Sequence, residues 1–477
     1  MEKYDVLIVG AGVVGTAIAR ELSRYRLKVA ILEKESELSF GVSKSNSGII
    51  HPGTQCNPQL LKSRLCVAGN RSIRRVAREL GVDFKEVGEL IVAFTPEEVS
   101  KLLELKKNGE KLKVPRLQIV SQPWLRKNEP NLSPHALAAL FAPTAGILSP
   151  YRLTYDLGEN AVRNGVAIYT ETKVEAIDFT NPGFKVYASK RSFVSDYLIN
   201  ACGLYADEIS AMVGITDFVI TPRKGEEFLL DKKRENMTNH LIFPLPSKKS
   251  KGVLVIKTAD GNPMIGPTAV DQKDKSDILT SDQGFKEVIS SVQRLVPSIN
   301  PSDIIAYFAG LRPSAGEDFI IRHENSVFGF VNVAGIQSPG LTAAVSIAEY
   351  VSRILKDIGL DLKRKLFFHK TRKRTIHLFN LNKAQAERII SKEPEFADIV
   401  CRCEMISKKE VSDAISRGAK TLDGIKFRTR LGAGRCHGGF CTSRALKILS
   451  EETDTPITKI TKRGGDSYII KKKRFDD

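Results

Sequence analysis

Cysteine is scarce in this sequence. Only seven cysteines occur among 477 residues, together with five methionines and one tryptophan. A small secreted protein held together by disulfides carries far more cysteine for its length, so a disulfide framework is excluded. In a reducing compartment, closely spaced pairs of cysteines more often bind a metal. Any local cluster of cysteines in this chain is therefore informative.

Long hydrophobic runs are also missing. The longest apolar stretch near the start, residues 6–19, contains three glycines and is shorter than the ~20 residues that cross a bilayer. It lacks the cationic flank and the cleavage pattern of a signal peptide. We therefore expect no transmembrane segment and a cytoplasmic protein, either free or peripheral at a membrane.

Acidic residues are outnumbered by basic ones. The chain has 73 Lys and Arg against 55 Asp and Glu, a formal net charge of +18. The basic residues are densest at 369–377 and 471–474, without the aromatic or recognition-helix patterns of nucleic-acid-binding proteins. We therefore expect no nucleic acid. A small anionic substrate, an acidic partner, an anionic membrane surface or merely a solvated basic surface fits the charge.

The first 34 residues predict a strand, a glycine turn, a helix and a second strand. The apolar run Val6–Val9 is followed by Gly10, Gly12 and Gly15, the spacing of a dinucleotide-binding turn. The first glycine permits the turn, the second lets the backbone approach a pyrophosphate, and the third lets helix and strand pack closely. Glu33 ends the second strand, where its carboxylate can accept the ribose hydroxyls.

NAD and FAD both use this fingerprint. No second G-x-G-x-x-G follows a strand later in the chain, which argues against a reductase that binds two dinucleotides. Instead, residues 41–53 follow, where Ser45, Asn46 and Ser47 offer small hydroxyl and amide groups to a longer cofactor. The sequence therefore favours FAD.

Later segments complete this picture. Residues 173–179 alternate as a strand after a helix, and residues 197–203 predict a buried strand that runs into a glycine turn. Residues 327–351 predict a strand, a glycine turn and a helix that begins near Leu341. Backbone amides there would face the electron-rich edge of a reduced flavin, unless the turn is an ordinary strand-to-helix connection.

Four segments together resemble the D-amino-acid-oxidase superfamily of FAD oxidoreductases: the N-terminal head, residues 45–53, residues 200–210 and residues 307–344. Within it, the chain is similar to glycerol-3-phosphate dehydrogenases and L-2-hydroxyglutarate dehydrogenases over about residues 1–355. The resemblance implies an α/β fold in which a Rossmann-like FAD-binding domain is interleaved with an antiparallel-sheet substrate domain. The residues it implies at the cofactor are Gly10, Gly12, Gly15, Glu33, Lys34, Ser45, Asn46, Ser47, Val174, Ala201, Gly203, Gly310, Gly335, Gly340, Leu341 and Thr342.

Two residues are candidates for the chemistry. Oxidation of a secondary alcohol by a flavin needs a base for the hydroxyl proton, and His51 lies in the segment expected beside the flavin ring. Arg312 can clamp an anionic substrate with its planar guanidinium. A packed loop histidine and a structural ion pair are the plainer alternatives. Lys257 is a weaker candidate, because it also suits a solvated strand position.

Four of the seven cysteines lie near the C-terminus. Cys401 and Cys403 are followed after 32 residues by Cys436 and Cys441. Four thiolates at two points of the chain can hold zinc or a [2Fe-2S] cluster, and spacing alone does not decide. Between the pairs the pattern predicts a helix, a turn and a short helix, with Ser407 and Glu410 as a capping box. The other cysteines, Cys56, Cys66 and Cys202, suit packing.

The cysteine block resembles bacterioferritin-associated-ferredoxin-type domains, which implies a [2Fe-2S] cluster. Fused to a flavin dehydrogenase, it resembles the anaerobic glycerol-3-phosphate dehydrogenase catalytic subunit. We therefore expect oxidation of glycerol 3-phosphate to dihydroxyacetone phosphate, with electrons passing from FAD through the cluster to a second flavoprotein or a membrane anchor subunit. Dehydrogenation of L-2-hydroxyglutarate, or of another small 2-hydroxy acid or amino acid, is the alternative. An electron-carrier or cluster-delivery adaptor is the non-enzymatic alternative.

The length exceeds the ~250–300 residues of one hydrophobic core, so several domains are expected. The expected boundaries are 1–80, 150–211 and 311–360 for the FAD-binding domain, 81–149 and 212–310 for the substrate domain, 361–395 for a linker, 396–455 for a small helical iron–sulfur domain, and 456–477 for a basic tail.

Overall fold

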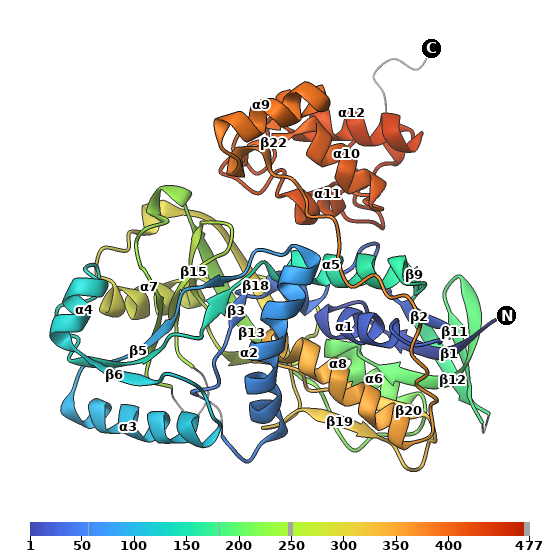
Figure 1. The fold of residues 1–477 in the computed structure, drawn as a ribbon, viewed down its shortest axis with the longest axis horizontal. Coiled ribbons are helices and arrows are strands. Elements are labelled where there is room, and N and C mark those ends of the chain that lie inside the picture. Colours follow the sequence, from blue (N-terminus) through green and yellow to red (C-terminus); the bar gives the residue numbers. More distant parts are fainter. Residues whose placement is uncertain (56, 181, 247–250, 472–477) are drawn as a thin grey trace.

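The computed structural model describes residues 1–471 except 56, 181 and 247–250. Cys56 and the end of the basic tail, residues 472–477, lie outside the described residues. A large body formed by residues 1–360 carries a small C-terminal module at one side (Figure 1).

A mainly parallel sheet forms one half of the body. Its strand order is β10-β11-β12-β1-β2-β9, and β20 pairs with β12 and β19. The parallel pairs are β1 with β12 and β2, β2 with β9, and β12 with β20. Its strands are β1 (Glu2–Val9), β2 (Val29–Leu32), β9 (Ala167–Tyr169), β10 (Val174–Phe179), β11 (Phe184–Ala188), β12 (Arg191–Asn200), β19 (Ile320–His323) and β20 (Phe330–Ala334). The strands expected at 173–179 and 197–203 are confirmed as β10 and the end of β12.

Helices cover this sheet and share its core. β1 is buried on both faces, with Val6, Leu7 and Ile8 at 0% exposure, as expected of a central parallel strand. One apolar cluster joins β1, β2 and the helices α1, α2, α5 and α8. These helices are α1 (Val13–Leu22), α2 (Leu61–Leu80), α5 (Pro150–Arg163) and α8 (Gly340–Asp357), with α6 (Ala206–Ala211) beside β20. The helix expected to begin near Leu341 is confirmed as α8.

A second sheet forms the other half of the body. Its order is β17-β13-β16-β15-β14-β5-β7-β6, with β18 paired to β13. All its pairs are antiparallel except β14 with β5, which lie parallel because distant segments of the chain bring them together. Its strands are β5 (Glu89–Ala93), β6 (Gln118–Ser121), β7 (Ala138–Ala142), β13 (Thr221–Leu230), β14 (Leu241–Pro244), β15 (Leu254–Lys257), β16 (Pro263–Gly266), β17 (Val270–Asp271) and β18 (Ile304–Ser314). Its helices are α3 (Pro96–Lys111), α4 (Gln122–Asn128) and α7 (Asp282–Leu295).

Between the halves lies a small sheet of β3 (Ile49–Ile50), β8 (Gly146–Ile147) and β4 (Lys85–Glu86). The mixed α/β architecture with two interleaved halves agrees with the expected fold class. The domain boundaries themselves remain a proposal, and β18 continues to Ser314, past the boundary expected at 310–311.

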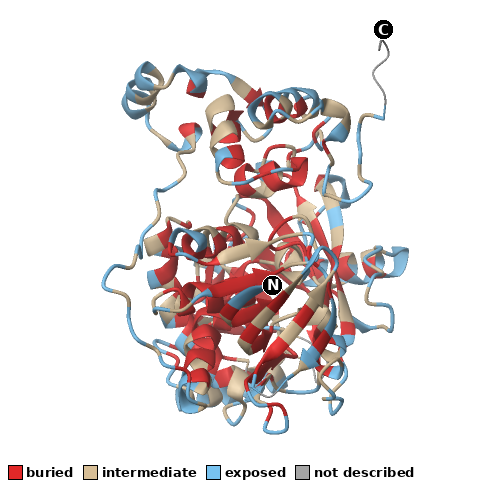
Figure 2. Ribbon diagram, turned by 90° about the vertical axis from the view of Figure 1, so that its right-hand side faces the viewer, coloured by how far each residue is buried: buried red, intermediate tan, exposed pale blue. Residues whose placement is uncertain are grey.

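The segment after α8 runs along the outside of the body to the C-terminal module (Figures 1 and 2). Its backbone is held at several points: Arg26 N–H donates to the Lys363 carbonyl at 2.8 Å, and Lys365 N–H donates to the Arg24 carbonyl at 2.9 Å. Arg372 forms ion pairs with Asp156 and Glu159 of α5. The expected linker is thus attached to the body over its first part, and its second part forms α9 (Lys383–Lys392).

The C-terminal module has its own small core. It contains β21 (Ile399–Cys401), β22 (Ile406–Ser407), α10 (Lys408–Ser416), α11 (Leu422–Thr429) and α12 (Thr442–Thr453). The expected capping box is confirmed, because Ser407 accepts from the Glu410 N–H while the Glu410 side chain accepts from the Ser407 N–H. No helix in the described part of the chain is long and apolar enough to span a bilayer.

Candidate active site

A cavity of about 2910 Å³ runs through the body and reaches the C-terminal module. It is several times larger than a typical small-molecule pocket of about 300–1,000 Å³. Its far end is lined by Lys426, Phe427, Arg430 and His437 of the C-terminal module. The cavity therefore has room for a long cofactor together with a substrate, and residues of both parts of the protein line it.

The glycine turn forms one wall of this cavity. Gly10 has a φ of +103°, and a Cβ there would lie 2.5 Å from the Ala201 carbonyl oxygen. A Cβ on Gly15 would lie 2.0 Å from the Gly10 carbonyl oxygen, so larger residues are excluded at both positions. Gly12 is the N-cap of α1 and lines the cavity. The first amide of α1, the N–H of Val13, donates to the Ser43 hydroxyl at 2.9 Å, and this helix end lines the cavity, which suits a diphosphate.

Glu33 lies at the end of β2 in the same wall. Its carboxylate accepts the N–H of Ala11 at 2.7 Å and the N–H of Glu35 at 2.9 Å. Burial raises the pKa of Glu33, and these two N–H donors oppose the rise. The carboxylate is therefore fixed at the cavity edge, in the position from which it can accept ribose hydroxyls.

Most of the cofactor residues expected from the sequence line this cavity. Those that do are Gly10, Gly12, Glu33, Lys34, Ser45, Asn46, Ser47, Val174, Ala201, Gly203, Gly310, Gly340 and Leu341. Gly15 lies beneath the turn, and Gly335 follows β20 with a φ of +67°. Thr342 is fully buried in α8 and accepts the backbone N–H of His51 at 2.9 Å. The roles of these residues remain proposals.

His51 lies in the cavity wall with most of its ring buried. Its Nδ1 is 4.0 Å from Glu89 Oε2, and Glu89 in turn accepts the hydroxyl of Thr54 at 2.6 Å. Its Nε2 is 3.3 Å from the ammonium of Lys251 and 3.4 Å from the hydroxyl of Ser338. Burial, followed by the charge of Lys251, holds the pKa of His51 well below its usual value of 6.5.

This environment defines how His51 is protonated. An ammonium can only donate, so Lys251 requires Nε2 of His51 to accept, and the ring proton then resides on Nδ1, toward Glu89. His51 is therefore neutral near pH 7, with a basic nitrogen beside the cavity. Glu89, Lys251 and Ser338 were not identified from the sequence.

Arg312 reaches the same cavity from β18. Its guanidinium donates to the Thr268 carbonyl and lies over Gly225, where a Cβ would come within 2.4 Å of Nη2. Burial raises the pKa of Glu227 to about 8, against the opposing charge of Arg312. Lys257, the weaker sequence candidate, is absent from the cavity lining among the described residues and lies 3.4 Å from the Thr238 carbonyl.

The four C-terminal cysteines meet as two pairs. The Sγ atoms of Cys403 and Cys436 are 3.6 Å apart, and Cys401 is hydrogen-bonded to Cys441. Cys401 and Cys441 are buried, whereas Cys403 is exposed. In the part of the chain that is described, no three or more such side chains converge closely enough to be recognised as a metal site. The structure thus brings both cysteine segments together, and their role as ligands remains a proposal.

Backbone amides surround the sulfur atoms. A hydrogen bond from Cys441, followed by the N–H groups of Gly432 and Glu404, lowers the pKa of Cys401 to about 6. The N–H of Phe440 is the main group that lowers the pKa of Cys436. Amides that stabilise thiolates are what a [2Fe-2S] cluster requires of its surroundings. The donor set therefore fits a thiolate-bound cluster.

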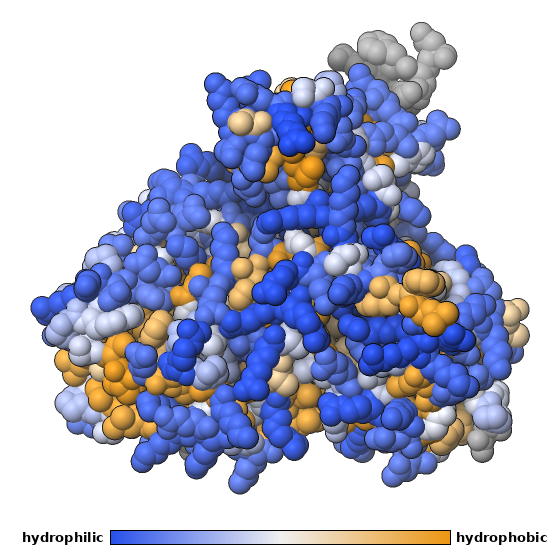
Figure 3. Space-filling model, viewed as in Figure 1, coloured by the Kyte–Doolittle hydropathy of each residue, from blue (hydrophilic) through white to orange (hydrophobic). Residues whose placement is uncertain are grey.

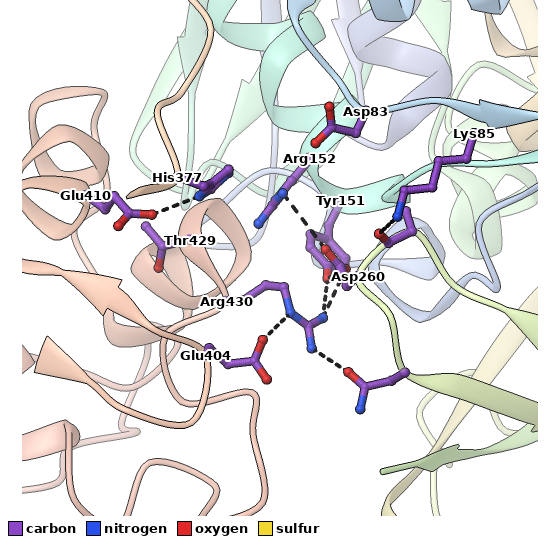
Figure 4. A network of polar contacts seen from close by, with 12 residues as sticks. Asp83, Lys85, Tyr151, Arg152, Asp260, His377, Glu404, Glu410, Thr429 and Arg430 are labelled. Atoms are coloured by element: carbon purple, nitrogen blue, oxygen red, sulfur yellow. Dashed lines mark hydrogen bonds and ion pairs between the residues drawn. The ribbon is translucent and has the colours of Figure 1, made fainter. Parts of the chain in front are cut away.

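Arg430 connects the cysteine segments to the cavity rim (Figure 4). Its Nε donates to Glu404 Oε2 at 2.8 Å, next to Cys403. Its Nη1 donates to Asp260 at 3.0 Å and to the Tyr151 hydroxyl at 3.1 Å, both on the body. The second cysteine segment is also attached, because His437 Nε2 is 2.7 Å from the Ile305 carbonyl and Arg435 Nη2 donates to Asp231 at 2.8 Å.

Two family models match the chain. Residues 5–354 match the FAD dependent oxidoreductase family (DAO). Residues 399–451 match the BFD-like [2Fe-2S] binding domain. The two matches fall on the body and on the C-terminal module described above.

Similar proteins cover either the whole chain or the body alone. A glycerol 3-phosphate dehydrogenase of Caloramator mitchellensis is 41% identical over 98% of both chains. The mitochondrial L-2-hydroxyglutarate dehydrogenase of Caenorhabditis elegans is 30% identical over 74% of this chain and 93% of its own. The structure of dithionite-reduced L-alpha-glycerophosphate oxidase from Mycoplasma pneumoniae with FAD bound is 33% identical, with a TM-score of 0.75 over 78% of this chain and 99% of that one.

FAD and a [2Fe-2S] cluster are the cofactors that these matches establish, in agreement with the expectation from sequence. The glycine turn and Glu33 fit the first cofactor, and the four cysteines with their amide donors fit the second.

Proposed function

Because this chain belongs to the FAD-dependent oxidoreductase family and carries a BFD-like [2Fe-2S] domain, we propose that it oxidises glycerol 3-phosphate to dihydroxyacetone phosphate. The relatives that are glycerol 3-phosphate enzymes support this substrate, one of them over nearly the whole chain. FAD, when bound, accepts the hydride from the substrate carbon.

A single feature of the cavity supports this chemistry: a neutral histidine lies beside the ammonium of Lys251 and shares the cavity with the guanidinium of Arg312. His51 is unprotonated because its pKa is held below 6.5, and its Nδ1–H faces Glu89. Its Nε2, which accepts from Lys251, can take the hydroxyl proton of the substrate when the Lys251 ammonium pairs with the substrate phosphate instead. Lys251 and Arg312 line the same cavity and can neutralise a phosphate dianion. Thr342 fixes the backbone of His51, so the base is held in one position.

The electrons then leave one at a time. The four cysteines of the C-terminal module would hold the cluster that carries them to an electron-accepting partner, either a subunit in solution or one at a membrane surface. The attachment of both cysteine segments to the cavity rim supports this route, since it keeps their distance from the cavity constant.

L-2-hydroxyglutarate is the second candidate substrate. It is a secondary alcohol with anionic groups, and the similarity of the body to an L-2-hydroxyglutarate dehydrogenase favours it. Lys251 and Arg312 can pair with a carboxylate as well as with a phosphate. The same base, His51, would serve both substrates.

Anaerobic reduction of the flavin separates these candidates. The holoenzyme is mixed with glycerol 3-phosphate, L-2-hydroxyglutarate, lactate or glycine in turn, and the loss of flavin absorbance is followed. We expect rapid bleaching with glycerol 3-phosphate and slow or no bleaching with the others. Faster bleaching by L-2-hydroxyglutarate would make that compound the substrate in place of glycerol 3-phosphate. An absence of bleaching by every compound would favour an electron-carrier or cluster-delivery adaptor.

A further inference from the structure

Phe440 lies between two cysteines yet projects into water. Its side chain is 86% exposed, more than any other large apolar side chain in the described residues. Its own backbone N–H points to the sulfur of Cys436, so the segment that carries the ring is held at the thiolate. Met405, two residues after Cys403, is a second exposed apolar residue on the other cysteine segment. Because Cys403 and Cys436 are in contact, these side chains flank one place.

The cysteine segments have two different sides. Their inner side is attached to the body through Arg430, Arg435 and His437. Their outer side, which we call the Phe440 face, consists of Phe440, Met405 and the exposed Cys403, together with exposed arginines. The Phe440 face is therefore open to a partner while the inner side is occupied.

The charge around the Phe440 face is positive. Arg402 and Arg444 are exposed within the two segments, Arg444 in an ion pair with Asp398, and no acidic residue occurs at 401–403 or 435–444. Glu404, the acidic residue that follows, is only 4% exposed and is engaged by Arg430 and Lys232. An apolar centre with a basic border is complementary to a protein whose docking face is apolar in the middle and acidic at the edge.

Building on the proposed function, we propose that the Phe440 face is the docking site of an acidic one-electron carrier protein. One electron leaves the reduced cluster, which becomes oxidised, and the carrier is reduced by that electron. Since each substrate molecule supplies two electrons, two carrier molecules are reduced for each glycerol 3-phosphate. The aromatic ring supplies apolar contact area, as aromatic residues at interface centres usually do.

The test uses the holoenzyme and an acidic plant-type ferredoxin as the carrier. Binding of the oxidised, fluorescently labelled ferredoxin is measured by anisotropy, and its reduction is measured after the enzyme has been reduced with dithionite and desalted. Phe440→Ser should weaken binding by about 10–30-fold, and Phe440→Leu should restore much of it because the apolar contact remains. Phe367→Ser is the matched control, since Phe367 is 85% exposed on the linker, outside the cysteine segments.

Each outcome of this experiment either supports or overturns the proposal. Equal binding of ferredoxin by wild type, Phe440→Ser and Phe367→Ser, or no binding by wild type, would overturn the proposal. Sedimentation that finds a wild-type dimer and a Phe440→Ser monomer would also overturn it, because a second copy of the chain would then cover the ring. Binding of ferredoxin that depends on Phe440, without any flavin bleaching by glycerol 3-phosphate, would support the Phe440 face and disprove the proposed substrate.

Discussion

Inside the body, β1, α1 and α8 share one apolar core, whereas the C-terminal module has an apolar core composed only of its own residues. The two parts meet through ion pairs and through Phe427 of the module, which packs against the core of the body beside Phe40 and Tyr151. Buried Arg428 pairs with Glu37 at 2.9 Å, and Arg430 pairs with Asp260 at 3.0 Å. Hydrophilic side chains also predominate on the narrow neck between the two parts (Figure 3).

This difference indicates how each part tolerates change. Apolar cores are continuous, so a defect in one strand is felt by its neighbours. Ion pairs depend on a few atoms, and removal of one partner of a buried pair leaves the other charge unpaired at the junction, outside both apolar cores. The body and the module should therefore be separable by single substitutions, and the following experiments test that separation.

The largest effect is expected from His51→Ala, which removes the base of the body without touching the module. Loss of general-base catalysis should slow substrate-driven flavin reduction by about 10²–10⁴-fold. FAD content and the iron signal should remain near those of the wild type, because His51 contacts neither the glycine turn nor any of the four C-terminal cysteines; the one cysteine it contacts is Cys66 of the body. Stopped-flow absorbance and iron analysis measure both, and an unchanged reduction rate would make His51 a packing residue.

Cys436→Ser is the complementary change in the module. Mutation of a residue that only contacts a metal ligand lowers metal affinity or activity by about 10–100-fold. Loss of the proposed ligand Cys436 itself should lower turnover with a protein acceptor by at least as much. The rate of flavin reduction by substrate should stay within about twofold of the wild-type rate. Cys436 lies in the module, outside the body that holds the flavin site, and substitutions at distant, independent sites do not affect one another. Cys66→Ser is the control for iron content only, because Cys66 lies in α2 outside the module and contacts the His51 carbonyl. A normal iron content in Cys436→Ser would contradict the assignment.

The features of the sequence that the structure reproduces are those with local signals. Gly10, Gly12 and Glu33 follow from a strand and a helix within 34 residues, and the capping box of Ser407 and Glu410 spans a single turn. Local signals of this kind depend on backbone geometry, which neighbouring residues largely define. The fold class could be predicted for the same reason, since it rests on a series of such segments.

Contacts between distant segments could not be predicted. Lys251 lies 200 residues from His51, in a stretch rich in lysine where no position is distinguished from the next. Arg430 looks like any basic residue after a short helix, and its four partners come from three separate parts of the chain. Such contacts arise from tertiary packing, and one sequence carries no local sign of them.

Arg430→Gln tests the junction itself and should have an intermediate effect. The amide cannot replace the guanidinium fork that joins Glu404, Asp260 and Tyr151, so the module loses its fixed position. Electron transfer from flavin to cluster should slow by about tenfold, because small misplacements of reacting groups slow a reaction. Rapid freezing followed by spectroscopy of the cluster measures this step. Arg444→Gln, which breaks the exposed pair with Asp398, is the control, and equal slowing in both variants would remove the special role of Arg430.

The smallest effect is on the pH dependence of stability, which differs between the interior of the body and the junction. Burial raises the pKa of Glu227 to about 8, so between pH 5 and 8 the folded protein binds a proton that the unfolded protein has released. The contribution of Glu227 to stability therefore falls as pH rises through this window, by up to about 1.4 kcal/mol per pH unit.

Asp260 at the junction behaves oppositely. Burial raises the pKa of Asp260, but Arg430 and Arg152 outweigh burial and hold it below its usual value. Its contribution is present at neutral pH and is lost only in acid.

Glu227→Gln should flatten the decline of the unfolding temperature between pH 5 and 8, because a glutamine has no proton to release. Thermal unfolding of the holoenzyme, followed by circular dichroism at each pH, measures the difference between the variant and the wild type. Glu287→Gln on the exposed side of α7 is the control and should leave the decline unchanged. Parallel curves for wild type and Glu227→Gln would show that Glu227 is ionised in the folded protein, and that the charge of Arg312 prevails over burial inside the body as that of Arg430 does at the junction.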